Sequence, residues 1–169
     1  MVAIELSAID RHPPIVKTLR LPDESATLAF ARRLSLQSGL TDAFIALHGD
    51  LGTGKTTLVR HLLQALGVTG RIKSPTYAIV ESYALPAFNV WHFDFYRFND
   101  PQEWEDAGFR DIFSSTGLKL VEWPEKAAGL LPQADLELSL RTDSTSDAAR
   151  QATLTANTPQ GLALLEAIQ

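Results

Sequence analysis

The sequence predicts an α/β fold built in three layers around a mixed, mainly parallel sheet. A short apolar run from Ala43 to His48 leads through a glycine-rich loop into an amphipathic helix that starts at Lys55 or Thr56 and ends near Leu66. Strand, glycine loop and helix in this order open a parallel α/β unit. Two β-rich runs, Ala78 to Tyr83 and Phe88 to Phe95, flank a short Leu85-Pro86-Ala87 segment. They predict a β-hairpin, so the sheet is not purely parallel.

Capping signals and apolar spacing place the elements before the glycine-rich loop. Ile15 to Leu21 has the composition of a short strand, and Pro22 to Ser25 put acidic groups at a helix start, where they complement the helix dipole. Apolar positions then recur at i, i+3, i+4 and i+7 up to Leu34, which gives that helix one buried face, and Gly39 is the expected stop. Residues 1–14 form a tail whose order the sequence leaves open.

The elements after the hairpin follow from the same signals. Asp100 and Pro101 predict a helix N-terminus, and Gly108 is expected to end that helix. Leu118 to Trp123 is a buried-type strand. Alternating leucines from Leu136 to Leu140 predict a further strand that pairs with Arg150 to Ala156, and Thr158-Pro159 opens a final helix.

Length, charge and composition limit the class of protein. A chain of 169 residues fits a single domain with a substantial core. The absence of Cys excludes a disulfide framework and a Cys-based zinc site. The net charge of −5 argues against a protein that grips DNA or RNA alone, because phosphate binding needs clustered Lys and Arg. No apolar run approaches the ~20 residues of a membrane span, so a cytoplasmic protein without membrane contact is expected.

The segment Gly49-Asp50-Leu51-Gly52-Thr53-Gly54-Lys55-Thr56 matches G-x-x-x-x-G-K-[ST] at each fixed position. In such a P-loop, consecutive backbone N–H groups at a helix N-terminus wrap a polyphosphate. Lys55 is expected to reach the β- and γ-oxygens, the Thr56 hydroxyl to ligate Mg²⁺, and Thr57 to reach the α-phosphate. The motif therefore predicts nucleotide binding and a fold of the P-loop NTPase type.

A phosphate loop needs a partner acid at a neighbouring strand end, which holds Mg²⁺ directly or through water. Glu122 and Asp94 each end an apolar run, and the run before Glu122 is more like a central strand. On spacing alone either acid can equally be a solvated carboxylate, with Asp94 paired to Arg97. Thr76 invites comparison with the threonine that nucleotide switches place over the γ-phosphate, although a Ser-Pro-Thr turn is also ordinary loop chemistry.

Five segments resemble, in order and spacing, the TsaE (YjeE) family, the small bacterial ATPases of tRNA threonylcarbamoyladenosine synthesis. They run from about Leu21 to Pro132 and read HGDLGTGKTTLVRHLL, KSPTY, HFDFYR, DPQEWEDAGFRDIF and LVEWPEKAAGLLP. The resemblance implies a P-loop α/β fold, ATP or ADP and Mg²⁺ as ligands, and TsaB and TsaD as partners. It implies ATP hydrolysis that supports repeated modification of the adenosine next to the anticodon, with tRNA contacted through the partners.

The resemblance also implies roles for individual residues. By position, Lys55 is the phosphate lysine, while Thr56 and Glu122 belong to the Mg²⁺ site. Asp94 resembles the acid that organises catalysis, and Thr76 a switch-like residue near the γ-phosphate. Trp123 is implied to lie close to the nucleotide, and Pro22 to Ser25 near its base.

Two other functions compete with this interpretation. A small-molecule kinase of P-loop type also has this size, but it usually carries an Arg-rich lid, and the arginines after the loop helix are few and scattered. A GTP-dependent switch is disfavoured because the chain has neither an Asn-Lys-x-Asp nor an Asp-x-x-Gly motif.

Overall fold

The computed structural model describes residues 13–168, so most of the expected tail, residues 1–12, lies outside the described residues. The described chain contains one seven-stranded sheet, five α-helices and two short 3₁₀ helices, Ser38–Asp42 and Pro124–Ala127. In chain order the elements are β1 (Ile15–Leu21), α1 (Glu24–Ser35), β2 (Phe44–His48), α2 (Lys55–Ala65), β3 (Val80–Ala84), β4 (Asn89–Asp94), α3 (Pro101–Asp106), α4 (Phe109–Ser114), β5 (Leu118–Glu122), β6 (Leu136–Asp143), β7 (Ser146–Ala156) and α5 (Pro159–Ala167).

The strand order is β1-β7-β6-β2-β5-β4-β3, and the four central strands β6, β2, β5 and β4 are parallel. β7 and β3 run antiparallel to their neighbours, and β1 is antiparallel to β7 and so points the same way as the central strands. The sheet is thus mixed and mostly parallel, as predicted. Both predicted hairpins form, β3 with β4 and β6 with β7.

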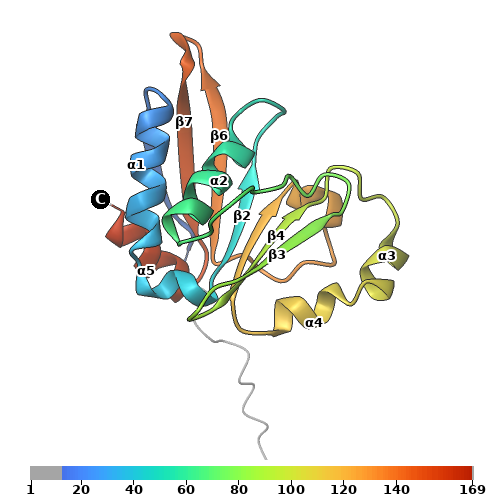
Figure 1. Cartoon of the computed structure of the whole chain (residues 1–169). Coiled ribbons are helices and arrows are strands. Elements are labelled where there is room, and N and C mark those ends of the chain that lie inside the picture. Colours follow the sequence, from blue (N-terminus) through green and yellow to red (C-terminus); the bar gives the residue numbers. More distant parts are fainter. Residues whose placement is uncertain (1–12, 169) are drawn as a thin grey trace, which may run out of the picture.

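The sheet separates two hydrophobic cores, which gives the three predicted layers (Figure 1). β2 supplies both cores, because Ile45 and Leu47 pack with α1, α2 and α5, whereas Phe44 and Ala46 face the other side. That second side is an aromatic cluster covered by α3 and α4, in which Trp104 is 1% exposed. Alternate side chains of a strand point to opposite faces, so a continuous apolar run such as β2 is what a covered sheet needs.

One predicted boundary was wrong, and one helix was not predicted. Helix α1 ends at Ser35 rather than near Gly39, because the Leu36 N–H turns back to the Arg33 carbonyl at 3.3 Å, and Gly39 falls inside a following 3₁₀ helix, Ser38–Asp42. Gly39 also lacks the positive φ that a helix-ending glycine adopts. Gly108 does end α3, with φ 70°, but the chain then enters the unpredicted helix α4.

Within residues 13–168, no helix combines the length and the apolar character that crossing a membrane requires.

Candidate nucleotide site

Three predicted site segments meet at the carboxyl ends of the central strands. Gly49 follows β2 directly, Glu122 is the last residue of β5, and Asp94 is the last residue of β4. The register pairs Leu47 with Glu122 and Glu122 with Asp94, so the phosphate loop and both acids lie side by side. The carboxyl edge of an open parallel sheet is where ligands bind in α/β proteins.

The phosphate loop is shaped by glycine backbone and by its own hydrogen bonds. A Cβ on Gly49 would lie 2.6 Å from the Thr53 hydroxyl and 2.7 Å from the Leu140 carbonyl, so a side chain does not fit there. Gly54 caps α2 with φ 101° and no side-chain cap, which leaves the first N–H groups of the helix free of a capping side chain. The Thr53 hydroxyl donates to the Asp50 carbonyl at 2.9 Å and closes the loop. Uncapped N–H groups at a helix start favour an anion.

Lys55 is the cation of the loop and is buried, with 5% of its surface exposed. Its Nζ donates to the carbonyls of Gly49 and Asp50, the latter at 3.0 Å, and lies 4.4 Å from the centre of a Trp123 ring. Burial lowers the pKa of Lys55, and the negative charge of Glu122 opposes that shift. An ammonium group in this position can bind phosphate oxygens.

Thr56 and Glu122 face each other across the pocket floor. The Thr56 hydroxyl donates to one carboxylate oxygen of Glu122 at 2.8 Å, and His92 contacts the other at 2.6 Å. Glu122 is only 2% exposed, so these two partners, rather than water, contact its carboxylate.

Asp94 forms a second acidic position beside Glu122. Its carboxylate accepts from the Thr76 hydroxyl at 3.2 Å and from the Tyr96 N–H at 2.9 Å. Burial raises the pKa of Asp94, and the charge of Glu122 adds to that rise, while the Tyr96 N–H opposes it. The alternative pairing of Asp94 with Arg97 does not form, because Arg97 stacks on the Tyr77 ring at 4.4 Å.

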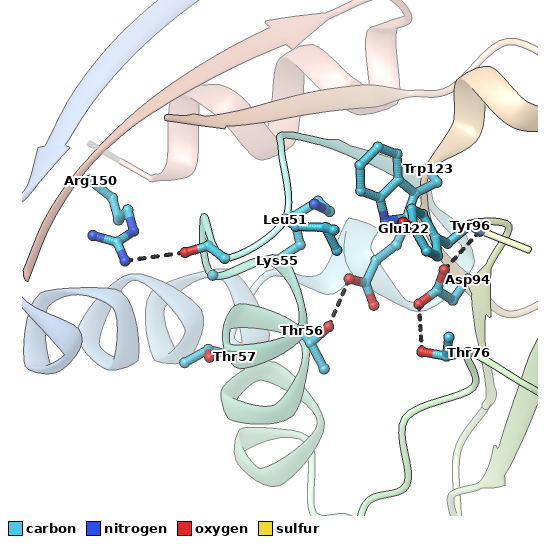
Figure 2. A pocket seen from close by; sticks show the side chains of 12 residues that line it. Leu51, Lys55, Thr56, Thr57, Thr76, Asp94, Tyr96, Glu122, Trp123 and Arg150 are labelled. Carbon is cyan, nitrogen blue, oxygen red and sulfur yellow. Dashed lines mark hydrogen bonds between the residues drawn. The ribbon is translucent and has the colours of Figure 1, made fainter. Parts of the chain in front are cut away.

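These groups line one pocket of about 370 Å³, within the usual range for small-molecule sites. Figure 2 shows Asp94 and Thr76 at one end of the pocket, with Arg150 and Thr57 at the other. A second cavity of about 240 Å³ shares Gly54, Thr57 and Arg150 with it and reaches Glu24 and Thr27 of α1.

Most of the predicted site residues come together in this lining. The pocket is formed by Leu51, Gly52, Gly54, Lys55, Thr56, Thr57, Thr76, Asp94, Glu122 and Trp123 of the predicted set, together with Tyr96 and Arg150. Gly49, Asp50 and Thr53 stand behind the lining. The carbonyls of Gly49 and Asp50 accept from Lys55, and the Thr53 hydroxyl donates to the Asp50 carbonyl.

Sequence reasoning missed Tyr96 and Arg150. Tyr96 packs on Trp123 with ring centres 5.1 Å apart, and its place two residues after Asp94 was a usable signal. Arg150 comes from β7 and donates to the carbonyls of Thr53 at 3.0 Å and Gly52 at 3.3 Å. No local pattern marks Arg150, because it lies 97 residues from the loop that it contacts.

Known proteins resemble this chain over most of its length. The sequence model of a family described as threonylcarbamoyl adenosine biosynthesis protein TsaE matches residues 21–152. A Haemophilus influenzae protein named tRNA threonylcarbamoyladenosine biosynthesis protein TsaE is 40% identical over 154 residues, covering 89% of this chain and 96% of the relative. The Bacillus subtilis protein of the same name is 33% identical, covering 80% of this chain and 81% of the relative.

A solved structure extends the likeness to three dimensions. The crystal structure of Bacillus subtilis YdiB superposes with a TM-score of 0.72 and 27% sequence identity, covering 93% of this chain and 96% of the other. The family match over most of the chain and the relative at 40% identity show that the protein belongs to the TsaE family.

Proposed function

We propose that this protein binds and hydrolyses ATP with Mg²⁺ and acts in the synthesis of tRNA N6-threonylcarbamoyladenosine together with TsaB and TsaD. The observation that carries the proposal is the meeting of a phosphate loop, the Thr56–Glu122 pair and the Asp94–Thr76 pair in one pocket. The biosynthetic role is supported by the names of the relatives, which share up to 40% of the aligned residues.

Phosphate and base recognition divide between the two adjoining cavities. The uncapped start of α2 and the Lys55 ammonium attract the phosphates, because both present positive charge to an anion. The neighbouring cavity between Thr57 and Glu24 is the place left for the base, which agrees with the role that the resemblance gives to the start of α1. We expect a nucleoside triphosphate to lie along these two cavities.

The residues present fit Mg²⁺ bound together with a nucleotide. Thr56 and Glu122 offer oxygen ligands of the kind that Mg²⁺ prefers, and Asp94 stands beside them. Within residues 13–168, no cluster of three or more His, Cys, Asp or Glu side chains is arranged to hold a metal alone. Mg²⁺ usually combines one or two carboxylates with substrate phosphates, so Thr56 and Glu122 would hold it only with the nucleotide. When bound, Mg²⁺ neutralises charge on the phosphates.

For hydrolysis, this chain supplies an orienting acid but few cations. Asp94, held by Thr76 and Tyr96, accepts a hydrogen bond from the attacking water and aligns it. Lys55 and Arg150 are the cationic side chains of the described lining, and Arg150 lies at the end away from Asp94 (Figure 2). One cation at the reacting end predicts slow turnover by the isolated chain.

The partners are expected to complete the site through the Thr76 loop. Thr76 is followed by Tyr77, which is 83% exposed, so this loop is open to contact by another protein. Ordering of a loop over the γ-phosphate is a known switching device. Binding of TsaB–TsaD should therefore change ATP turnover or nucleotide affinity.

The test is an ADP-release assay with the purified chain. Incubation with ATP and Mg²⁺ alone is expected to give slow ADP production, and addition of TsaB–TsaD and unmodified tRNA is expected to change the rate. Identical rates with and without the pair would contradict the partnership. ADP production that requires an added small-molecule acceptor would instead establish a kinase.

Replacing Glu122 by Gln should weaken ATP binding only when Mg²⁺ is present. The carboxylate charge that holds the cation is lost, whereas the loop contacts to phosphate remain. The expected loss is roughly tenfold to a hundredfold in the presence of Mg²⁺. Calorimetry in Mg²⁺ and in EDTA measures both affinities, and an equal loss in the two buffers would contradict the assignment.

Replacing Arg150 by Ala should weaken ADP and ATP binding to a similar degree. Arg150 holds the carbonyls of Gly52 and Thr53 at the end of the pocket away from Asp94, where the two nucleotides do not differ. The expected loss is roughly tenfold, as for removal of a charge-assisted hydrogen bond. Arg110→Ala on the exposed face of α4 is the matched control and should leave both affinities unchanged. A loss confined to ATP would place Arg150 at the γ-phosphate instead.

A further inference from the structure

His92 lies in β4 and reaches the acid that faces the phosphate loop. Its Nε2 lies 2.6 Å from one carboxylate oxygen of Glu122, and His92 is 1% exposed. The sheet register pairs Asp94 with Glu122, so His92 sits two positions earlier on the neighbouring strand, diagonal to the acid. His92, Asp94 and Glu122 therefore project from the same face of the sheet, the face that carries α2.

The two carboxylate oxygens of Glu122 have different partners. Oε1 accepts from the Thr56 hydroxyl at 2.8 Å, and Oε2 accepts from His92 Nε2. A carboxylate bound at one oxygen alone can rotate about its last bond. With both oxygens bound, its plane is fixed, and Oε1 stays directed at the loop and at the place where the nucleotide binds.

The second ring nitrogen of His92, Nδ1, gives no separate reason for a polar ring at this position. His92 Nδ1 is buried and has no hydrogen-bond partner among residues 13–168. A buried polar atom without a partner destabilises the fold, and an apolar side chain of similar size would avoid this cost. The contact with Glu122 is thus the one hydrogen bond that the ring makes in the described chain.

We propose that His92 is a positioning residue that orients Glu122 toward the Mg²⁺ of the bound nucleotide. This inference rests on the proposed function, since it assumes that Glu122 belongs to a Mg²⁺ site. Carboxylates that bind metals are commonly held by further hydrogen bonds, and removal of such a partner lowers metal affinity about ten- to hundredfold. Loss of His92 should therefore remove the Mg²⁺-dependent part of ATP affinity and leave the Mg²⁺-independent part intact.

Three substitutions separate this role from packing. His92→Leu removes the donor and keeps an apolar side chain of similar volume. His92→Gln places an amide nitrogen near the position of Nε2, whereas His92→Asn places it near the position of Nδ1, too far from Glu122. The dissociation constant of ATP is measured by calorimetry for each purified variant, once with excess Mg²⁺ and once with EDTA. Thermal melts confirm that each variant is folded.

The wild-type chain should bind ATP more tightly with Mg²⁺ than with EDTA. His92→Leu and His92→Asn should lose roughly tenfold or more of that gain, as is expected of Glu122→Gln, with the EDTA value unchanged. His92→Gln should retain the gain. This pattern would support a positioning role, because a packing defect would lower affinity in both buffers and would not distinguish Gln from Asn.

Other outcomes separate the two proposals. A wild-type chain that binds no ATP, or shows no gain from Mg²⁺, would contradict the proposed function itself. A wild-type gain that His92→Leu retains, or a loss of equal size with and without Mg²⁺, would overturn the inference about His92 alone. Should His92→Leu fail to fold, the Gln and Asn pair decides, and equal Mg²⁺ dependence in these two variants would overturn it.

Discussion

Lys55→Ala is expected to lower ATP turnover by at least roughly a hundredfold, with a similar loss of ATP affinity and a smaller loss of ADP affinity. Lys55 is the only cationic side chain of the described lining at the Asp94 end of the pocket, and its Nζ is held there by loop carbonyls and the Trp123 ring. Its removal leaves the developing charge on the γ-phosphate without a cationic side chain beside it. Steady-state ADP release and calorimetry measure the two effects.

Lys119 provides a matched control for this substitution. It is likewise buried, at 4% exposure, its Nζ donates to the Ser115 carbonyl, and it lies 5.6 Å from the centre of a Trp91 ring. It is the second residue of β5 and lies near the amino end of that strand, away from the phosphate loop. Lys119→Ala should lower stability but leave nucleotide affinity unchanged, and equal nucleotide loss in both variants would show a general effect of removing a buried lysine.

Asp94→Asn is expected to lower turnover by roughly a hundredfold or more while ATP affinity stays within about twofold. The amide keeps the size of the side chain but accepts the hydrogen bond of the attacking water more weakly than a carboxylate does. Asp111→Asn on the exposed face of α4 removes the same charge far from the pocket and should leave turnover unchanged. Loss of ATP binding in Asp94→Asn would assign Asp94 to nucleotide or Mg²⁺ binding instead.

The same substitution should stabilise the fold at neutral pH. Burial raises the pKa of Asp94 above 3.8, so its contribution to stability is complete below that pH and is lost as the pH rises through the raised pKa. An uncharged Asn does not suffer this loss, and a gain of roughly 1 kcal/mol corresponds to a Tm increase of about 3 °C for a chain of this length. Thermal melts should show the difference at about pH 7 and its disappearance near pH 3.5. A variant that melts below the wild type at pH 7 would contradict this.

Local sequence signals predicted the elements that build the phosphate site. The apolar run before Gly49, the glycine pattern and the helix periodicity after Lys55 each depend on near neighbours in the chain, and all three elements form where expected. Asp100 caps α3 through a bond from the Gln102 N–H at 2.9 Å, again a contact across two residues. Gly39 misled the prediction because glycine permits a helix end without requiring one.

Sequence spacing left the roles of the two acids open. Glu122 and Asp94 are distant in the chain, and each was equally compatible with a solvated carboxylate. The parallel register of β4 and β5 places the two acids side by side. Asp94 is 5% exposed and Glu122 2% exposed. Their hydrogen-bond partners include Thr76, Thr56 and His92. Burial and these partners are consequences of sheet order, which the sequence alone did not specify.

By itself, the sequence determined that this protein has a phosphate loop between a buried strand and a helix, since backbone conformation and helix capping are decided within a few residues. Only the tertiary structure brought Arg150 to the loop from β7 and placed His92 against Glu122. Contacts between distant segments depend on strand order and register, which are fixed when the two hydrophobic cores pack on either side of the sheet.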